Sequence, residues 1–251
     1  SIYHPHGCNL DLAESIKKAV HIPVTAVGGF NDPQQIEDAI ASGKCDFVAM
    51  GREMLADPDF VNKTAAGRED EIMPCLRCSC FNPLASDPTK RVQVVPFECT
   101  VNPTSMRQLR LEWAPRVRTP GQKVLVIGGG PGGMYAAMTA AQRGHRVTLM
   151  DKGDKLGGTL WYTDYDCHKD DMRKFRDHLA NRVYRAGVDV QLGVTATKET
   201  IEQFGPDAVI LAIGARPVAP AIPGLREHAK YALDCYTHAP GKKLVMIGGG
   251  Q

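Results

Sequence analysis

The first 67 residues alternate between two patterns of hydrophobic positions. In some stretches apolar side chains recur every three to four residues, as in an amphipathic helix, and in others they form short continuous runs. Glycine, proline and capping residues separate these stretches. The pattern predicts helices over residues 11–20, 33–43 and 57–67 and strands over residues 24–27 and 46–50. Strands that alternate with helices favour parallel pairing with helical crossovers.

Regular patterning fades between residues 68 and 120 and returns near Lys123. The intervening stretch is rich in proline and cysteine, so we expect it to fold around a ligand rather than around its own hydrophobic core. Beyond it, strand and helix patterns alternate again. We expect strands over residues 123–127, 146–150 and 207–213 and helices over residues 131–143 and 170–186.

One strand-plus-glycine element occurs twice in the chain. Residues 123–130 read Lys-Val-Leu-Val-Ile-Gly-Gly-Gly, and residues 243–250 read Lys-Leu-Val-Met-Ile-Gly-Gly-Gly. A repeat of this kind predicts two nucleotide-binding units, the second beginning with a strand at residues 243–247. The chain also starts at Ser1 without a methionine and stops at Gln251, just after this second element. We therefore expect a part of a longer polypeptide.

Composition narrows the class of protein. The 251 residues carry 30 basic and 28 acidic side chains, a net charge of +2, and no basic block typical of nucleic-acid binding. Residues 124–142 are uncharged and long enough to cross a bilayer, but glycines interrupt them as in a strand, turn and helix. We therefore expect a soluble, cytoplasmic protein with no nucleic-acid or membrane partner, and leave self-association into a homo-oligomer open.

Half of the eight cysteines gather in one window of the proline-rich stretch. Clustering of this kind favours metal ligation over the disulfide framework that short secreted chains use. The spacing alone leaves three states open, namely an iron–sulfur cluster, structural zinc and free thiols. The candidate ligands are Cys75, Cys78, Cys80 and Cys99.

A Gly-x-Gly-x-x-Gly fingerprint at Gly128, Gly130 and Gly133 follows the strand predicted at residues 123–127. Glycines at these positions allow a tight turn and let backbone N–H groups approach a pyrophosphate at a helix N-terminus. Asp151 ends the next strand, where its carboxylate can accept ribose hydroxyls. The fingerprint predicts dinucleotide binding.

The residues after this acid, Asp151-Lys-Gly-Asp-Lys-Leu-Gly-Gly158, and the strand ending in Ala212-Ile-Gly214 resemble the FAD half of two-dinucleotide-binding flavoprotein reductases. The resemblance implies an NAD(P) half inserted after the first FAD segment, which agrees with the second triglycine. It assigns FAD to Gly128, Gly130, Gly133, Asp151, Lys152, Gly157 and Gly158, and NAD(P) to Gly248 and Gly250.

The order of segments resembles the 2,4-dienoyl-CoA reductase and trimethylamine dehydrogenase group of old-yellow-enzyme-like flavoproteins. The resemblance implies an α/β chain made of the C-terminal end of a TIM barrel, an iron–sulfur connector and a Rossmann-like FAD/NAD(P) domain. The corresponding bounds are residues 1–67 for strands seven and eight of the FMN-binding barrel, 68–120 for the connector, 121–242 for the FAD-binding domain and 243–251 for the start of the NAD(P)-binding domain. FMN would lie against Gly28, Gly29, Gly51 and Arg52, and a 4Fe-4S cluster on the four clustered cysteines.

This group implies an NAD(P)H-dependent enzyme that reduces the C=C bond of a small α,β-unsaturated carbonyl compound, such as an enoate or enoyl-CoA. Electrons would pass from NAD(P)H to FAD, the 4Fe-4S cluster, FMN and substrate. An amine dehydrogenase that passes electrons to a partner protein is one alternative, and a non-catalytic electron-transfer or zinc-stabilised nucleotide-binding module is another. Most of the barrel, with the catalytic groups, would lie outside these residues, so this stretch alone is expected to be inactive.

For four side chains outside these motifs we expect structural rather than catalytic roles. We expect His4 and His6 to lie in a solvent-exposed loop. Asp170 and Asp171 are expected to do no more than begin a helix, where acidic residues complement the helix dipole.

Overall fold

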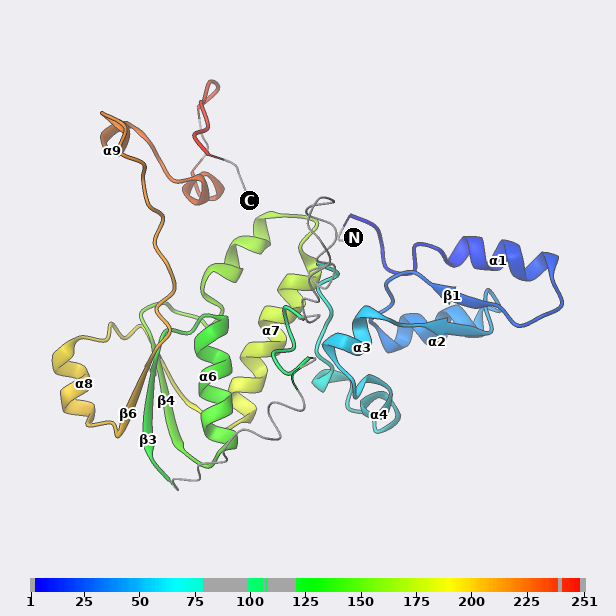
Figure 1. Ribbon diagram of the computed structural model, residues 1–251, viewed down its shortest axis with the longest axis horizontal. Helices are drawn as coiled ribbons and strands as arrows, with labels where there is room; N and C mark the ends of the chain where they lie inside the picture. The colour runs from blue at the N-terminus through cyan, green and yellow to red at the C-terminus, as the bar shows by residue number, and fades with distance from the viewer. Residues whose placement is uncertain (1–2, 79–98, 106, 108–120, 239–240, 249–251) are drawn as a thin grey trace, which may run out of the picture.

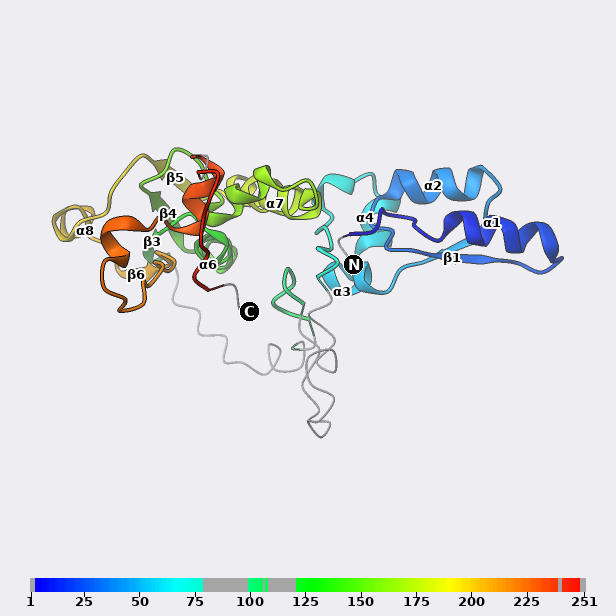
Figure 2. The ribbon, with the colours of Figure 1, turned by 90° about the horizontal axis from the view of Figure 1, so that it is seen from above.

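The computed structural model describes residues 3–78, 99–105, 107, 121–238 and 241–248. Two units of α/β structure lie at opposite ends of these residues, and helix α7 (Asp170–Arg185) lies between them (Figure 1). Seen from above, the same order holds along the long axis (Figure 2). The predicted ligand Cys80 and the predicted NAD(P) residue Gly250 lie outside the described residues.

The first unit contains two parallel strands, β1 (Thr25–Val27) and β2 (Phe47–Ala49), as predicted. Helices α1 (Leu10–Ala19) and α2 (Pro33–Ala41) alternate with them along the chain. Helix α2 begins where the Asp32 carboxylate accepts the backbone N–H groups of Gln34 and Gln35, which satisfies donors that a helix start leaves unpaired. Buried side chains join the strands to the helices, among them Ala13, Val24, Ala26, Phe30, Ala39 and Cys45. The predicted closure into a barrel stays a prediction.

The segment after β2 differs from its prediction. Three short helices form there: α3 (Arg52–Ala56), α4 (Phe60–Ala65) and the 3-10 turn η1 (Glu69–Glu71). Sequence patterning predicted one helix over residues 57–67, and it missed α3 because five residues are too few to display helical periodicity. Arg52, a candidate FMN-binding residue, is the first residue of α3.

The second unit is a four-stranded parallel sheet in the order β5-β4-β3-β6. Its central strands, β3 (Lys123–Ile127) and β4 (Arg146–Asp151), agree with the prediction, and β6 (Ala208–Leu211) is shorter than predicted. Strand β5 (Asp189–Leu192) was not predicted because its Asp-Val-Gln-Leu sequence alternates over only four residues.

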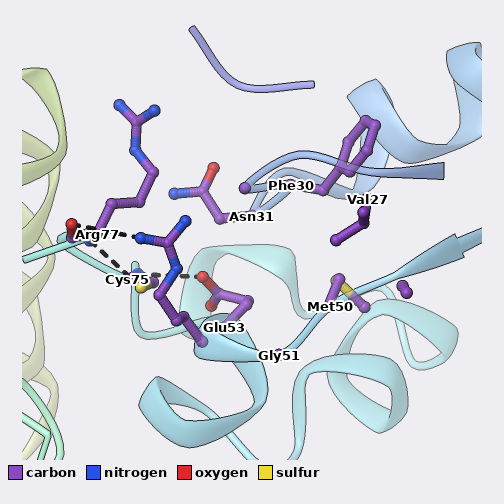
Figure 3. A pocket seen from close by; sticks show the side chains of 11 residues that line it. Val27, Phe30, Asn31, Met50, Gly51, Glu53, Cys75 and Arg77 are labelled. Atoms are coloured by element: carbon purple, nitrogen blue, oxygen red, sulfur yellow. Dashed lines mark hydrogen bonds between the residues drawn. The ribbon is translucent and has the colours of Figure 1, made fainter. Parts of the chain in front are cut away.

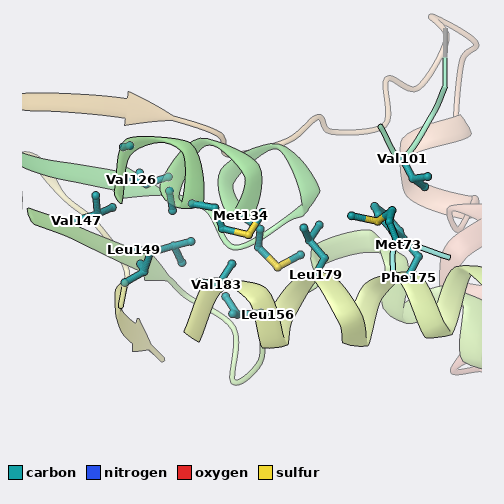
Figure 4. Packing of buried hydrophobic residues seen from close by; sticks show 14 of the residues in the cluster. Met73, Val101, Val126, Met134, Val147, Leu149, Leu156, Phe175, Leu179 and Val183 are labelled. Carbon is teal, nitrogen blue, oxygen red and sulfur yellow. The ribbon is translucent and has the colours of Figure 1, made fainter. Parts of the chain in front are cut away.

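Helices cover both faces of this sheet. Helix α6 (Pro131–Gln142) and α7 pack on one face, where Met134, Leu149, Leu179 and Val183 are almost completely buried (Figure 4). Helix α8 (Lys198–Phe204), which the hydrophobic pattern did not reveal, covers Leu125 and Met150 on the other face. Apolar side chains on both sides are expected for a parallel sheet, whose strands are buried on both faces. The 3-10 segment η3 (Gly158–Tyr165) then leads toward α7.

The strand predicted at residues 243–247 is not formed. None of the described strands pairs with this segment, and its apolar residues are exposed, Val245 to 90%. An extended segment needs a neighbouring strand to satisfy its backbone groups, whatever its own propensity. The segment follows two short helices, α9 (Leu225–His228) and η4 (Ala232–Tyr236). Among the described helices, none combines the length and the apolar character needed to span a bilayer.

Candidate functional site

The glycines of the fingerprint have different surroundings. A Cβ atom on Gly133 would lie 1.8 Å from the carbonyl oxygen of Gly128, and one on Gly128 would lie 2.3 Å from the carbonyl oxygen of Ala212. Gly128 also has a φ of +110°, which side-chain-bearing residues rarely adopt. A Cβ on Gly130, by contrast, would meet no atom within 4 Å. Gly128 and Gly133 therefore hold the strand, turn and helix together, and Gly130 faces open space at the start of α6.

Asp151 binds the same turn. Its Oδ2 accepts the N–H of Gly129 at 2.6 Å, and its Oδ1 accepts the N–H of Gly153 at 2.6 Å. A carboxylate offers about four lone-pair sites, so these two bonds leave capacity for a ribose hydroxyl. Asp151 thus fixes the glycine turn itself, and Lys152 beside it is exposed.

Gly157 and Gly158 fold back onto the fingerprint. The Gly157 N–H donates to the carbonyl oxygen of Gly129 at 2.8 Å, and a Cβ on the exposed Gly158 would lie 3.0 Å from the Cα of Gly130. Small residues on both sides therefore leave a cradle in front of the α6 N-terminus, where backbone N–H groups and the helix dipole favour an anion. This cradle fits the pyrophosphate of a dinucleotide.

Trp161 lies beside this cradle between two cations. The Lys155 ammonium is 3.4 Å from the ring centroid and the Arg176 guanidinium carbon is 3.5 Å from it. The indole N–H donates to the carbonyl oxygen of Leu156 at 2.8 Å. Cation–π contacts on a fixed ring orient the Gly157 loop.

A second concave region lies at the ends of β1 and β2, with a volume of about 180 Å³ (Figure 3). Arg52 and Gly29, two of the four residues predicted to hold FMN, line it. Gly51 lines it too, whereas Gly28 packs beneath, with its missing Cβ only 2.9 Å from the Cys8 backbone nitrogen. A guanidinium beside glycine turns is the chemistry that binds a phosphate, so these residues fit the predicted group.

Glu53 is a functional candidate in this pocket that the sequence did not reveal. The side chain is 2% exposed, and its Oε2 accepts the backbone N–H of Cys75 at 3.1 Å. Among the residues that the structure describes, none is a hydrogen-bond partner of its Oε1. Burial raises the pKa of the Glu53 carboxyl to about 8. Only the placement of α3 against the cysteine segment makes this acid distinctive, and no spacing pattern records that placement.

The three described cysteines of the candidate ligand set differ in burial. Cys75 is buried, Cys99 is half-buried and Cys78 is exposed. The Sγ of Cys75 accepts the backbone N–H of Arg77 at 3.3 Å, and the Sγ of Cys78 lies 3.2 Å from the hydroxyl of Thr100. Burial raises the pKa of the Cys75 thiol to about 11, with the nearby Cys99 contributing. Within the ranges that the structure describes, no three His, Cys, Asp or Glu side chains are grouped to hold a metal ion.

One feature of these surroundings suits a thiolate-ligated group. The Sγ of Cys75 already accepts a backbone N–H, and hydrogen bonds to sulfur are a means by which proteins tune iron–sulfur clusters. The described sulfurs are not gathered into a ligand set, so the cluster stays a prediction.

His6 and Asp171 correct two expectations. The His6 ring is 21% exposed rather than free in solvent, and its Nε2 lies 2.8 Å from the Asp171 Oδ1. Asp171 is buried, and its Oδ2 accepts the Nε–H of Arg77 at 2.7 Å. Burial alone would raise the pKa of the Asp171 carboxyl, but His6 and Arg77 hold it below its ordinary value. Asp171 therefore does more than begin a helix.

Comparisons with known proteins match each of the two units to a protein family. Residues 122–251 match the family described as pyridine nucleotide-disulphide oxidoreductase, and residues 6–71 match the NADH:flavin oxidoreductase / NADH oxidase family. An NADH oxidase of Thermoanaerobacter brockii is 41% identical over 256 residues, covering 97% of this chain and 38% of that protein. A cinnamate reductase of Clostridium sporogenes is 36% identical, covering 99% of this chain and 36% of that protein.

A solved structure of 2-naphthoyl-CoA reductase in complex with 2-naphthoyl-CoA superposes with a TM-score of 0.79 at 30% identity. The match covers 91% of this chain and 34% of that one. The chain thus spans little more than a third of the length of the relatives that it matches. Both family matches and these relatives agree with the order of segments inferred from the motifs. The chain belongs to the 2,4-dienoyl-CoA reductase and old-yellow-enzyme-like group of NADH:flavin oxidoreductases.

Proposed function

We propose that this chain is part of an NAD(P)H-dependent oxidoreductase that reduces the C=C bond of an α,β-unsaturated carbonyl compound of the enoate or enoyl-CoA type. One observation carries the proposal. Cys75 lines the pocket formed by Gly29 and Arg52, and it also belongs to the buried core that contains Met134 and Phe175 of the second unit. The cysteine segment thus contacts both candidate flavin units.

The proposed ligands follow from these two units. FMN would be held by Gly28, Gly29, Gly51 and Arg52, FAD by the glycine cradle with Asp151 and Lys152, and NAD(P) by Gly248 and Gly250. The cysteine segment would hold a 4Fe-4S cluster. When bound, these groups supply hydride and single-electron chemistry, the electrons passing from NAD(P)H to FAD, to the cluster, to FMN and to substrate.

The chain itself supplies binding and exclusion of water. Arg52 places a positive charge beside the Gly29 turn, where it neutralises a phosphate. Backbone N–H groups at the start of α6 do the same for a pyrophosphate. Met73 and Val101, on either side of the cysteine segment, pack near Phe175 and keep water from the Cys75 side (Figure 4). A buried, preorganised setting of this kind strengthens electrostatic interactions with the bound groups.

Anaerobic titration of the full-length protein with NADH tests the proposal. We expect flavin absorption, equal amounts of iron and labile sulfide, bleaching of the flavin by NADH, and reoxidation by cinnamate or an enoyl-CoA. Bleaching by a secondary or tertiary amine in the absence of NADH would support the amine dehydrogenase alternative instead. A protein that holds zinc and no flavin would contradict both and leave the non-catalytic module.

A further inference from the structure

Asp171 joins three segments that lie far apart in the sequence. Its carboxylate receives one hydrogen bond from His6, in the loop before α1, and another from Arg77, in the cysteine segment. Asp171 itself is in the first turn of α7, which packs against the sheet of the second unit. The three side chains therefore connect the pocket unit, the cysteine segment and the dinucleotide-binding unit.

The His6 ring bridges two segments of the chain. Its Nδ1 lies 2.5 Å from the carbonyl oxygen of Gly29, and its Nε2 lies 2.8 Å from the carboxylate of Asp171. The carboxylate of Asp171 thus lies between the His6 ring and the Arg77 guanidinium.

The same groups reach the pocket. Gly29 and Arg77 both line it, and Arg77 also donates to the carbonyl oxygen of His4. Each link from Asp171 therefore ends on the turn or loop that shapes the candidate FMN site.

The ion pair between Asp171 and Arg77 is buried. Asp171 is 4% exposed and Arg77 is 9% exposed in its side chain, so the pair is shielded from water and salt. A second ion pair, between Arg185 at the other end of α7 and Asp70, links α7 to η1, but both partners are more than half exposed, and such pairs contribute little. The two carboxylate oxygens of Asp171 bind different segments, Oδ1 binding His6 and Oδ2 binding Arg77, and hydrogen bonds require a narrow range of distance and angle.

We propose that Asp171 is a positioning residue that sets the separation and orientation of the two flavin units through His6 and Arg77. The inference rests on the proposed function, in which electrons pass between the units. The rate of electron transfer between fixed sites falls steeply with their separation. A connection that prevents small movements of the Gly29 turn relative to α7 therefore governs the rate of electron transfer between the two units. It does not affect the oxidation of NADH, which takes place at the second unit.

The experiment uses the full-length holoenzyme with Asp171→Asn, and with Asp170→Asn as the matched control. Asp170 is the neighbouring acid in the same helical turn, but it is 71% exposed and pairs only with Arg173 among the ion pairs that the structure describes. Both variants remove one negative charge from the helix start. Anaerobic stopped-flow mixing with NADH separates reduction of FAD from the later appearance of reduced FMN.

For Asp171→Asn we expect FAD reduction at the wild-type rate and a later phase that is several-fold slower than in the wild type. In turnover, kcat falls while kcat/KM for NADH, which reports the unaltered reduction of FAD, does not change. Asp170→Asn is expected to match wild type in both phases. Equal later phases in the two variants would overturn the inference.

A second variant covers the case in which Asp171→Asn does not fold. His6→Gln breaks the link on the pocket side and leaves the Asp171–Arg77 pair intact, so it should slow the later phase while the melting temperature stays near that of wild type. An unchanged later phase in a folded His6→Gln protein would count against the inference.

Hydrogen–deuterium exchange tests the positioning role of Asp171 independently of the cofactors. Asp171→Asn, or His6→Gln if the former is unfolded, should raise exchange at residues 4–9 and 28–31, and Asp170→Asn should not. If the wild-type protein contained no cluster or second flavin, the proposed function would fail while this readout still supported the positioning role. Equal exchange in all variants would overturn the positioning role in either case.

Discussion

Gly133 contacts Gly128 so closely that a Cβ on Gly133 would lie 1.8 Å from the Gly128 carbonyl oxygen. Gly130, between them in the sequence, has no atom within 4 Å of its missing Cβ. The three glycines of one fingerprint therefore divide into two that pack the chain against itself and one that faces open space. Within this single motif, Gly128 and Gly133 serve folding, whereas Gly130 is placed for the proposed ligand binding.

Replacement of Gly133 by alanine is expected to destabilise the second unit by about 3 kcal/mol, because the methyl group cannot be accommodated without moving β3 away from α6. Urea denaturation followed by far-UV circular dichroism measures the change in the free energy of unfolding. FAD content should fall with it. A Gly133→Ala protein with wild-type stability would show that the turn relaxes freely.

Replacement of Gly130 by alanine is the matched comparison. Its φ of −74° suits alanine and the site has room, so the free energy of unfolding should change by less than about 0.5 kcal/mol. The added methyl group would enter the cradle proposed for the pyrophosphate and weaken FAD binding. Fluorimetric titration of the apoprotein with FAD checks this outcome, and unaltered affinity would place the ligand elsewhere.

Lys63 and Asp57 form a largely buried ion pair between α4 and the residue that ends α3. The Lys63 ammonium lies 2.5 Å from the Asp57 Oδ2, and Asp57 is 4% exposed. Burial alone would raise the pKa of the Asp57 carboxyl, but Lys63 and the N–H groups of Met73 and Asp59 lower it. Lys63→Met leaves this carboxylate unpaired and should cost about 3–5 kcal/mol of stability.

Lys44→Met is the control for loss of a lysine charge. Lys44 pairs with Asp11, which is 91% exposed, and such surface pairs contribute at most about 1 kcal/mol. Thermal unfolding of both variants at neutral pH compares the two cases. Equal effects would show that water screens the Asp57 pair as well as the surface pair.

His178 makes stability depend on pH in the acid range. Burial, together with the positive charges of Arg182 and Lys63, lowers the pKa of the His178 ring to about 4. Below its ordinary value of 6.5 the unfolded chain binds a proton that the folded protein does not, so stability falls as pH drops from 6.5 toward 4. Above that window the residue has no effect on the pH dependence.

His178→Gln should remove this contribution. The difference between the wild-type and variant unfolding free energies, measured from pH 7.5 to pH 4, should change by at most about 1.4 kcal/mol per pH unit. Comparison with the variant cancels the acid loss that arises from carboxylates such as Asp57 and Asp171, whose lowered pKa values also weaken the fold on acidification. A flat difference curve would mean that the ring binds its proton as readily in the folded protein as in the unfolded chain.

Glu53→Gln is expected to be nearly neutral for stability. Because burial raises the pKa of Glu53 to about 8, the native carboxyl at pH 7 is mostly uncharged, and glutamine reproduces its acceptor for the Cys75 N–H. The free energy of unfolding should change by less than about 1 kcal/mol. Glu53→Ala leaves that N–H unpaired and should cost about 1–3 kcal/mol. Chemical denaturation at pH 7 distinguishes the two, and a large loss in Glu53→Gln would show that the charge itself is needed.

Local patterns predicted the elements that their own residues encode. The continuous apolar runs of β3 and β4, and the amphipathic pattern of α7, correspond to the structure within one residue or so at each end. Strand β5 and helix α8 were missed because packing against β4 and the far face of the sheet stabilises them, not a strong pattern of their own. The opposite error occurred at residues 243–247, where a strong strand pattern has no described partner strand.

The sequence by itself determined the family, the two candidate nucleotide elements and the cysteine segment, because glycine, acid and thiol spacings record backbone geometry and donor chemistry directly. Only the tertiary structure separated Gly130 from Gly128 and Gly133, since that distinction depends on which atoms approach from Ala212 and α6. It also brought His6 and Arg77 to Asp171, and Glu53 to Cys75. A buried carboxylate is defined by its partners across the fold, and no local spacing specifies partners that are 94 or 165 residues away.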